Sequence, residues 1–559
     1  MTALLAENLA PIMFAALVVV MLFGYPVAFA LAANGFVFGL VGIELGLLSP
    51  NLFGAIPDRI FGTMANETLL AIPFFTFMGL ILERSGMAED LLDTIGQLFG
   101  PIRGGLAYAV ILVGALLAAT TGVVAASVIS MGLISLPIML RYGYDRRVAA
   151  GTIAASGTLA QIIPPSLVLI VLADQLKTGS SQVVSVGDMY AGALIPGLIL
   201  TGLYASYILL VSIFKPQFVP ALPPEARTLR GAKLAIKVVT TLVPPLVLIF
   251  LVLGTIFIGL ATPTEGGAMG AVGALILAAI NRRLNVRMIY QALDTTAKLS
   301  SFVIFILLGA RVFSLTFYGV DGHLWVEHLL TAIPGGELGF LIVVNILVFL
   351  LAFFLDFFEL AFIIVPLLVP VAEKLGIDLV WFGIILGVNM QTSFMHPPFG
   401  FALFYLRSVA PARAYVDKIT GKTMAPVTSG QIYMGSIPYV IIQIVMVGLV
   451  IAFPYMVTHY KTTTEAVDPS TINIDIPMPG LGGPGAGDNP FGGPGAGDNP
   501  FGGPAPGDNP FATPPADGAA PASPPPPDFG APAAPSAPPS PGGLPPPDFG
   551  APATPAPAQ

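Results

Sequence analysis

The chain has 559 residues, of which 55% are hydrophobic and 10% are charged, and its mean hydropathy is +0.86. Soluble domains carry about 25% charged residues, so this composition excludes a soluble globular protein and indicates a membrane protein with many spans. The absence of cysteine excludes disulfides, thiolate metal sites and cysteine nucleophiles. The sequence contains no phosphate-loop motif, hydrolase triad or zinc-ligand spacing, so we expect neither an enzyme nor a bound cofactor.

The net charge of −8 comes from one segment of the chain. Residues 462–559 hold 28 of the 54 prolines and nine acids but no Lys or Arg, whereas residues 1–461 hold 23 basic and 22 acidic residues. The tail predicts disorder, because it cannot bury enough apolar surface to offset the entropy of ordering. A flexible extension is the simpler interpretation, and a partner-binding role for its repeated Phe residues is the alternative. The first ten residues carry no Lys or Arg, so we expect no cleavable signal peptide.

Twelve apolar segments follow one another along residues 1–461. Most have the length of a single span of about 20 residues. Two of them, 106–140 and 338–373, are too long for one span and carry polar or charged residues near the middle, so we expect re-entrant hairpins there. The twelve segments lie near 10–24, 26–48, 67–83, 106–140, 148–174, 189–214, 240–260, 266–280, 299–318, 338–373, 379–406 and 429–457.

The two halves of this region repeat each other at a fixed spacing. Five residues recur 233 positions later, including a Pro-Pro pair, and composition bias is the weaker explanation for five matches at one spacing. The matched pairs are Pro137 and Pro370, Gly143 and Gly376, Asp145 and Asp378, Pro164 and Pro397, and Pro165 and Pro398. Internal repeats of this kind are common in secondary transporters.

Charge in the loops predicts how the repeats are oriented, because cytoplasmic loops are enriched in Lys and Arg. Loop 49–66 has one Arg, whereas its counterpart 281–298 has three Arg and one Lys, and the bias also reverses at the other matched loops. We therefore expect two inverted repeats, 1–214 and 238–461, joined by a cytoplasmic linker, 215–237. Both termini are then predicted to lie in the periplasm.

The predicted fold is an all-α polytopic membrane protein with ten full spans, two re-entrant hairpins and two broken helices. The broken helices are 148–174 and 379–406, and each contains Pro-Pro in the middle of the span. Proline removes a hydrogen-bond donor and breaks the helix, which frees carbonyl groups suited to Na⁺ or similar ions. Broken helices at corresponding positions of two repeats indicate a transport site, and a pair of structural kinks is the alternative.

The hairpin tips are predicted to face these breaks. Small and hydroxyl residues at the first tip, such as Thr120 and Ser127, let the backbone approach an ion closely, although small-residue helix packing is the alternative. At the second tip, Asp356 and Glu359 lie one turn apart on one helical face and are functional-site candidates, because acids in a membrane are costly. Arg311 is a candidate partner for one of them, and a structural ion pair that holds the hairpin is an equal alternative.

Two further positions carry specific expectations. His396 precedes the second Pro-Pro pair, and it either titrates near neutral pH or hydrogen-bonds within the broken helix, which is the interpretation we favour. In the segment 262–267, Thr264 is the expected N-cap of a helix, with Glu265 in the first turn.

These motifs together resemble the large membrane subunit of the tripartite ATP-independent periplasmic (TRAP) transporters, over roughly residues 5–460. The resemblance is carried by Thr121-Gly122, Gly143-Tyr144-Asp145, Ile162-Ile163-Pro164-Pro165-Ser166, Thr262-Pro263-Thr264-Glu265 and Pro397-Pro398-Phe399-Gly400. The stretch 390–400 looks like the branch named for mannitol and chloroaromatic compounds.

The resemblance implies a multi-pass importer of the bacterial inner membrane, driven by a Na⁺ gradient and working by an elevator motion of both hairpins and both broken helices. It also implies two protein partners, a small four-span membrane subunit and a periplasmic solute-binding protein that delivers a small organic acid. Besides these partners and the lipid bilayer, we expect no nucleic-acid partner and no metal other than Na⁺.

The resemblance also implies site residues. The Na⁺ ions are expected to be held mainly by backbone carbonyls, at Thr121, Gly122, Ala160, Ile163, Pro164, Ser393, His396 and Phe399. The candidates for substrate contact and gating are Thr120, Ser127, Pro165, Ser166, Arg311, Asp356, Glu359, Pro397 and Pro398. Many relatives have Gly in place of Ala160 and Ser393 and Thr in place of His396. Carbonyl ligation survives such changes, whereas side-chain ligation at position 396 does not.

Two other functions remain open at the level of sequence. One is a stand-alone ion-coupled carrier for citrate, dicarboxylate or arsenite. The other, of a different class, is a membrane scaffold protein that acts through the tail 462–559. The sequence does not identify the transported solute, because the binding protein selects it.

Overall fold

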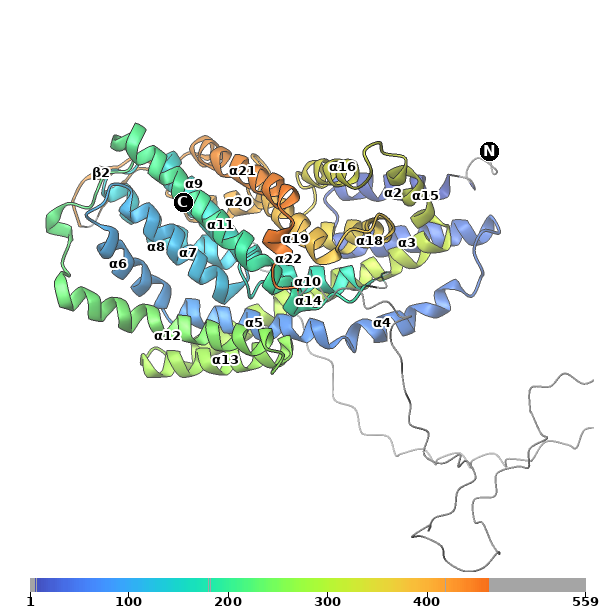
Figure 1. The fold of residues 1–559 in the computed structure, drawn as a ribbon, viewed down its shortest axis with the longest axis horizontal. Coiled ribbons are helices and arrows are strands. Elements are labelled where there is room, and N and C mark those ends of the chain that lie inside the picture. The colour runs from blue at the N-terminus through green and yellow to red at the C-terminus, as the bar shows by residue number, and fades with distance from the viewer. Residues whose placement is uncertain (1–5, 7, 179, 181, 418, 462–559) are drawn as a thin grey trace, which may run out of the picture. The chain divides into compact units, whose positions relative to one another are not determined.

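The structure is a computed structural model that describes residues 6, 8–178, 180, 182–417 and 419–461, without the side chains of Thr120 and Thr121. The predictions made for the tail 462–559 lie outside the described residues. Apart from one two-stranded antiparallel sheet, the regular structure in the described part is helical (Figure 1), as the composition predicted.

The first half of the chain forms ten α-helices and four short 3₁₀ turns among the described residues. The α-helices are α2 (Leu9–Leu22), α3 (Val27–Glu44), α4 (Ile56–Met64), α5 (Glu67–Arg84), α6 (Met87–Phe99), α7 (Gly105–Thr121), α8 (Val124–Arg141), α9 (Arg146–Thr158), α10 (Leu167–Leu176) and α11 (Val186–Phe214). The 3₁₀ turns are η1 (Leu52–Ala55), η2 (Leu159–Gln161), η3 (Pro216–Phe218) and η4 (Pro224–Ala226).

The second half repeats this order of helices. Its elements are α12 (Gly231–Phe257), α13 (Pro263–Ile280), α14 (Val286–Gly319), α15 (Gly322–Thr331), α16 (Gly336–Leu351), α17 (Phe357–Glu359), the π-turn η5 (Leu360–Ile364), α18 (Val365–Lys374), α19 (Leu379–Met390), η6 (Gln391–Phe394), α20 (Phe401–Val409), β1 (Tyr415–Val416), β2 (Thr423–Met424), α21 (Ser429–Ala452) and α22 (Tyr455–Thr458).

The spacing of 233 recurs in the boundaries of the helices. The second helix of the first predicted hairpin, Val124–Arg141, and the helical segment Phe357–Lys374 are 233 residues apart at both ends. Likewise α9 begins at Arg146 and α19 begins at Leu379. The repeat is therefore structural as well as sequential.

The repeated Gly and Asp residues have a common local role, which is to stop one helix and start the next. Gly143 and Gly376 have φ angles of 84° and 74°, the left-handed conformation that commonly ends a helix. Asp145 and Asp378 are the N-caps of α9 and α19, and each side chain accepts hydrogen bonds from backbone N–H groups of the first turn. The repeated Gly and Asp residues thus form the same kind of turn between two helices in each half of the chain.

The N-cap expected at Thr264 is instead Thr262. The Thr262 Oγ1 accepts from the Glu265 N–H at 3.2 Å, and a Glu265 carboxylate oxygen accepts from the Thr262 N–H at 2.8 Å. The prediction was wrong because Pro263 occupies the first helical position, where its missing N–H costs nothing, so the cap must precede it. Thr264 instead donates to the carbonyl of Glu67 at 2.8 Å and joins α13 to α5.

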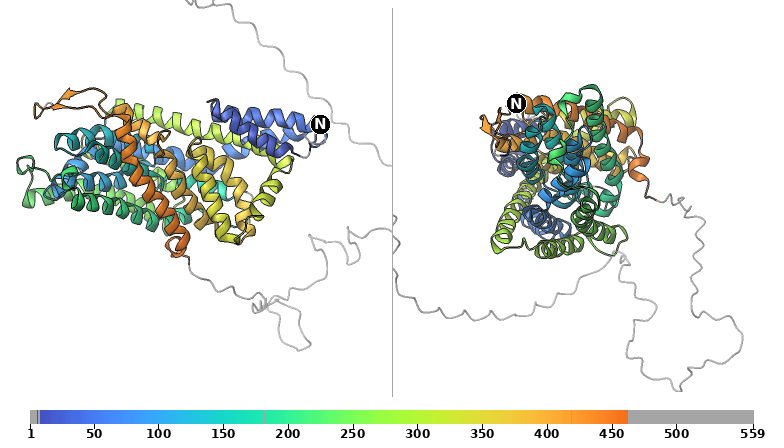
Figure 2. Two further views of the ribbon diagram at one scale, coloured as in Figure 1. Left: turned by 90° about the horizontal axis from the view of Figure 1, so that it is seen from above. Right: turned by 90° about the vertical axis from the view of Figure 1, so that its left-hand side faces the viewer.

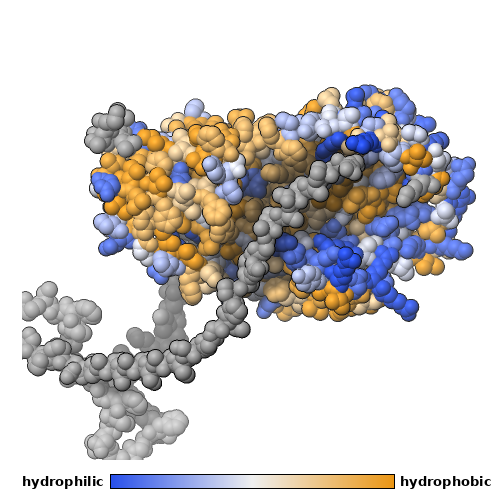
Figure 3. All heavy atoms as spheres, turned by 180° about the vertical axis from the view of Figure 1, so that it is seen from behind, coloured by the Kyte–Doolittle hydropathy of each residue, from blue (hydrophilic) through white to orange (hydrophobic). Residues whose placement is uncertain are grey.

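Seven helices are long and apolar enough to cross a membrane, or nine if each of two bent helix pairs is one span, among the described residues. Helix α2 and the broken helices fall short of that length test, so length alone does not test the expected ten spans. Large hydrophobic side chains are exposed on the helix surfaces, among them Phe23 at 77% and Phe250 at 71%. Broad hydrophobic areas cover the face drawn in Figure 3, as a lipid-facing surface requires.

Small residues let several helices pack backbone to backbone. Helix α9 packs on α21 where Gly151 and Gly435 meet, helix α14 runs along α3 (Figure 2), and helix α5 packs on α13. A Cβ atom built at Gly151 would lie 2.0 Å from the carbonyl oxygen of Gly435. Close approach at small residues is the usual way in which membrane helices associate.

Candidate functional site

The ends of α7, α8, α10, α17 and α20 meet at a cavity of about 220 Å³ between the two predicted hairpins and the two helix breaks. Its lining includes Gly122 at the first hairpin tip, Gln161 at the first break, Asp356 at the second tip and Phe394 at the second break. The other lining residues are Val123, Val124, Ala125, Leu167, Val168, Leu299, Phe302, Phe357, Phe358, Phe401 and Tyr405. Segments far apart in the sequence are therefore brought to one place, as the matched motifs predicted.

The first hairpin tip touches the first break through its backbone. Gly122 ends α7 with a φ of 58°, in the left-handed region that favours glycine. A Cβ atom at this position would lie 3.2 Å from the backbone N of Leu167 and 3.5 Å from the carbonyl oxygen of Pro165. Glycine thus serves both the turn and the close approach of the two backbones.

The first break is fully buried and is held by one serine. Helix α9 ends at Thr158, the turn η2 follows, and the Pro164–Pro165 peptide is cis. The Ser166 hydroxyl donates to the Gln161 carbonyl at 2.5 Å and accepts from the Val168 N–H at 3.2 Å, so Ser166 is the N-cap of α10. The chain therefore turns at this break, and a new helix begins at Leu167.

The other residues predicted for the first ion site lie around this corner. Ala160, Ile163, Pro164 and Pro165 are buried in it, and Ser127 is buried in the first turn of α8. Thr120 and Thr121 form the end of α7, and their side chains lie outside the described part of the structure.

Gln161 is a polar residue of the site that the sequence prediction missed. Its side chain is 1% exposed, and within the described residues neither its Oε1 nor its Nε2 has a hydrogen-bond partner. A buried amide without partners costs free energy, and such an atom facing a cavity calls for a ligand or water. The signal was a lone Gln between apolar residues and Pro-Pro.

A second glutamine marks the axis that relates the two repeats. The Gln391 Nε2 donates to the Thr158 Oγ1 at 3.1 Å, and these two residues are 233 positions apart. Residues at matched positions of two repeats touch each other only where the repeats meet at their symmetry axis. The Gln391 Oε1 is buried without a partner among the described residues.

The second break is packed with aromatic rings. His396 is stacked on Phe353 and meets Phe349 edge-on, each at a centroid distance of 4.3 Å. The expectation that the His396 side chain hydrogen-bonds within the broken helix was wrong, because neither ring nitrogen has a hydrogen-bond partner among the described residues of that helix. Its backbone makes the local bonds instead, through a donation to the Thr392 carbonyl at 3.0 Å.

The remaining residues predicted for the second ion site are spread over this break. The Ser393 hydroxyl donates to the Met390 carbonyl at 2.7 Å. The Pro397–Pro398 peptide is cis, and Phe399 is 52% exposed and lines a different cavity with Phe354 and Phe401.

Asp356 and Glu359 cap the second helix of the second predicted hairpin. The Asp356 Oδ1 accepts from the Glu359 N–H at 3.0 Å, and the Glu359 Oε2 accepts from the Asp356 N–H at 2.9 Å. This capping box satisfies backbone donors at the helix start. Of the two acids, only Asp356 lines the cavity.

The pairing expected for Arg311 is absent from the ion pairs of the described residues, none of which joins it to Asp356 or Glu359. Arg311 lines another cavity, together with Arg59. The prediction was wrong because Asp356 and Glu359 bond to backbone N–H groups of their own helix start, while Arg311 lies at that other cavity.

The cavity is lined by helix N-termini rather than by basic side chains. The first turns of α8, α10 and α20 line it, and helix N-termini carry unsatisfied N–H groups and a partial positive charge. No Lys or Arg is among its lining residues. Asp356, Gln161 and the Tyr405 hydroxyl add one carboxylate and two neutral polar groups.

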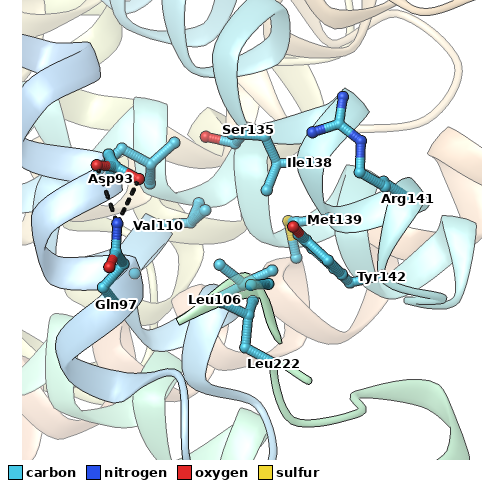
Figure 4. A pocket seen from close by; sticks show the side chains of 13 residues that line it. Asp93, Gln97, Leu106, Val110, Ser135, Ile138, Met139, Arg141, Tyr142 and Leu222 are labelled. Carbon is cyan, nitrogen blue, oxygen red and sulfur yellow. Dashed lines mark hydrogen bonds between the residues drawn. The ribbon is translucent and has the colours of Figure 1, made fainter. Parts of the chain in front are cut away.

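A separate cavity of about 120 Å³ lies among α6, α7, α8 and the linker, and its lining side chains are drawn in Figure 4. Its charged groups are already engaged. The Gln97 Nε2 donates to the Asp93 carboxylate at 3.1 Å, and the Arg141 guanidinium pairs with Asp417 at 2.9 Å. The bond from Arg141 holds the pKa of Asp417, in the loop after α20, well below its usual range.

Comparisons with known proteins agree with this architecture. A family profile described as the DctM component of the tripartite ATP-independent periplasmic transporter matches residues 14–456. The C4-dicarboxylate TRAP transporter large permease protein DctM of Pseudomonas aeruginosa is 32% identical over 378 residues, which cover 66% of this chain and 84% of that protein. The isethionate TRAP transporter permease protein DctMQ of Oleidesulfovibrio alaskensis is 28% identical over 72% of this chain and 61% of its own length.

A solved structure shares the fold. The YdaH transporter of Alcanivorax borkumensis superposes with a TM-score of 0.52 at 16% sequence identity, and the match covers 74% of this chain and 91% of that one. Together with the apolar helices and the matched helix breaks, these similarities establish a multi-pass membrane transporter subunit. The chain belongs to the DctM family, the large permeases of tripartite ATP-independent periplasmic transporters.

Proposed function

We propose that this chain carries a small organic anion across the bacterial inner membrane by Na⁺-driven elevator transport. The observation that carries the proposal is the cavity of about 220 Å³ at which the two hairpins and the two helix breaks meet. Helix N-termini from both repeats line it, and such termini favour a carboxylate or a similar group. The Gln161 amide, which is buried and has no partner in the described part of the chain, supplies donors and an acceptor for the same ligand.

The chemical class of the solute rests on the cavity and on the relatives. The names of the two relatives give a C4-dicarboxylate and isethionate, and both compounds are organic anions. The stretch 390–400 supports the branch named for mannitol and chloroaromatic compounds. We propose a carboxylate or sulfonate anion of few carbon atoms.

The coupling ion is proposed to bind at the backbone of the breaks and tips. One Na⁺ site lies near Thr121, Gly122, Ala160, Ile163 and Pro164. The contact of the Gly122 backbone with Pro165 and Leu167 supports this site, because a cation held by carbonyl groups needs two backbones in close approach.

The second site lies near Ser393, His396 and Phe399, with Pro397 and Pro398 beside it. The side chain of His396 packs against two aromatic rings, stacked on one and edge-on to the other, so this site relies on carbonyl groups. Na⁺ binding is proposed to order both breaks and so to complete the anion site, and the difference in affinity between ordered and disordered states sets the coupling.

The moving part is proposed to contain both hairpins and both broken helices, with re-entrant tips that open to the cytoplasm in the repeat 1–214 and to the periplasm in the repeat 238–461. The linker 215–237 is then cytoplasmic and both termini are periplasmic. A small four-span membrane subunit holds the static part, and a periplasmic solute-binding protein delivers the anion. The unmatched length of the DctMQ relative supports a further membrane part in this system.

Uptake into proteoliposomes tests the proposal. The chain is reconstituted with its small subunit, the binding protein is added outside, and uptake of a labelled C4-dicarboxylate or sulfonate is measured with and without an inward Na⁺ gradient. Uptake should require the gradient. Thr121→Val should change the Na⁺ dependence, whereas Thr255→Val, whose hydroxyl bonds only carbonyl groups of its own helix, should not. Equal uptake with and without the gradient overturns Na⁺ coupling.

A further inference from the structure

A second cavity, of about 230 Å³, lies apart from the cavity between the hairpins and contains two arginines. Arg59 enters it from α4 and Arg311 from α14, and the cavity shares no lining residue with the one between the hairpins. The other lining residues are Gln175, Thr178, Leu307, Ala310, Ser314, Tyr318, Phe362 and Pro366. At about 30 Å³ for each water molecule, the space holds a small organic anion.

The cavity is built by α4, α10, α14, η5 and α18, which come from different parts of the chain. Arg311, Ser314 and Tyr318 follow one another at positions i, i+3 and i+7 and therefore share one face of α14. The opposite wall comes from the end of α10 and from the turn η5 with the start of α18. The Tyr318 hydroxyl donates to the Pro366 carbonyl at 3.2 Å and closes one side.

No carboxylate of the described residues pairs with either arginine. The nearby Asp174 is engaged, because it accepts from the Asn66 Nδ2 at 2.6 Å and from the Gln175 Nε2 at 2.7 Å. Asp58 precedes Arg59 on α4, and neighbours in a helix do not share a face.

The two arginines bring like charges to one cavity. Arg59 and Arg311 both line it, and Arg311 is partly buried. Two like charges at one partly dry cavity repel, and the arrangement is costly until an anion lies between them.

We propose that this cavity is an anion site that holds a carboxylate or phosphate group between Arg59 and Arg311. Guanidinium groups offer paired donors in a fixed fork that fits both kinds of oxyanion. Ser314 and the amide of Gln175 lie on the same lining and offer neutral polar contacts. The bound anion bridges α4 and α14 on one side to α10 and α18 on the other. The site depends neither on Na⁺ coupling nor on the identity of the transported solute.

The test is anion binding to the full-length chain purified in detergent, measured by the midpoint of thermal unfolding and by calorimetry. Succinate and inorganic phosphate are each titrated at constant ionic strength against sodium chloride, and the variants are Arg59→Gln, Arg311→Gln and Arg287→Gln. Arg287 is the matched control, since it is exposed on α14 outside the cavity. At least one anion should stabilise the wild type, and loss of either cavity arginine should raise its dissociation constant about 10- to 100-fold, with Arg287→Gln unchanged.

Three further outcomes decide the matter. If succinate and phosphate have no effect but nanodiscs with anionic lipid stabilise the wild type and not Arg59→Gln, the phosphate belongs to a lipid headgroup and the site stands. If Arg59→Gln and Arg311→Gln respond like the wild type, or no anion stabilises the chain, the proposal fails. If adding the small subunit abolishes the anion effect, the arginines pair with an acidic side chain of that subunit and the proposal also fails. If Arg311→Gln does not fold, the exposed Arg59 still decides the test.

Discussion

Some single residues at the helix breaks stabilise the turn of the chain, and others face the cavity. Ser166 stabilises the turn, because its hydroxyl bonds across the break and caps α10. Gln161 faces the cavity, since it is one of the lining residues, and its amide is buried and unpartnered within the described residues. The Pro-Pro pairs correctly predicted the helix breaks. Proline contributes no polar side chain, however, so the polar group beside the first break is evident only from the folded structure.

Gln161→Leu should separate function from stability. The substitution removes a buried amide that has no partner, so the free energy of unfolding should stay equal or rise by about 1 kcal/mol. Transport should fall by tenfold or more, because the anion loses its neutral polar contact. Thermal unfolding in detergent and proteoliposome uptake measure the two effects.

Gln443 provides the contrasting control for this experiment. Its Nε2 donates to the Tyr204 hydroxyl at 2.9 Å between α21 and α11. Gln443→Leu should therefore cost about 1–3 kcal/mol of stability and leave uptake per folded molecule unchanged. A loss of stability in Gln161→Leu with normal uptake would show that the Gln161 amide is structural.

Whole elements show why the repeat was visible in the sequence. The residues that recur at 233 positions include the stop signal and the start signal of helices, Gly143 with Asp145 and Gly376 with Asp378, because those corners require φ > 0 and a capping carboxylate. Helix contacts are encoded more weakly. Gly435 of α21 lies against α9 while Gly448 of the same helix faces open space, and nothing local in the sequence separates the two.

Gly435→Ala should destabilise the protein, whereas Gly448→Ala should not. A Cβ atom at Gly435 would lie 2.1 Å from the carbonyl oxygen of Arg147, so α9 and α21 must move apart at a cost of about 1–3 kcal/mol or more. At Gly448 no atom lies within 4 Å, and Ala should stabilise the helix by about 0.5–1 kcal/mol. The midpoint of thermal unfolding measures both, and equal midpoints would contradict the close helix contact.

The candidate site was predictable to the level of segments but not of side-chain pairs. The hairpin tips, the breaks and Asp356 do line one cavity. Arg311 failed as a partner of Asp356 because the capping box with Glu359 satisfies that helix start locally. Which side chain pairs with an acid such as Asp356 depends on the residues that are closest in space, and spacing along the chain does not predict it.

At the scale of the whole molecule, two polar contacts join α5 to elements proposed to move. The Asn66 Nδ2 donates to Asp174 of α10 at 2.6 Å, and the Ser130 hydroxyl of α8 donates to Glu83. Helix α5 itself packs on α13 and α14. An elevator motion of the hairpins and broken helices must break both contacts.

A disulfide between positions 66 and 174 should therefore stop transport. The chain has no cysteine, so Asn66→Cys with Asp174→Cys introduces the sole pair. Oxidation should reduce uptake to background and a reductant should restore it. The control pair, Glu67→Cys with Thr264→Cys, joins α5 to α13 at the contact of Thr264 with the Glu67 carbonyl and should leave uptake unchanged after oxidation. Normal uptake by the oxidised first pair would exclude motion of α10 against α5.

Much of this protein's structure follows from interactions that are local in the sequence. The apolar composition required a membrane, the Gly and Asp corners set helix ends, and Pro-Pro broke two spans, since each of these effects acts within a few residues of the chain. The symmetry contact of Thr158 with Gln391, the exposure of Gln161 to a cavity and the meeting of Arg59 with Arg311 depended on the packing of helices more than 200 residues apart or on which atoms were left without a partner. Such facts arise only when the chain is folded, because burial and pairing are properties of neighbours in space.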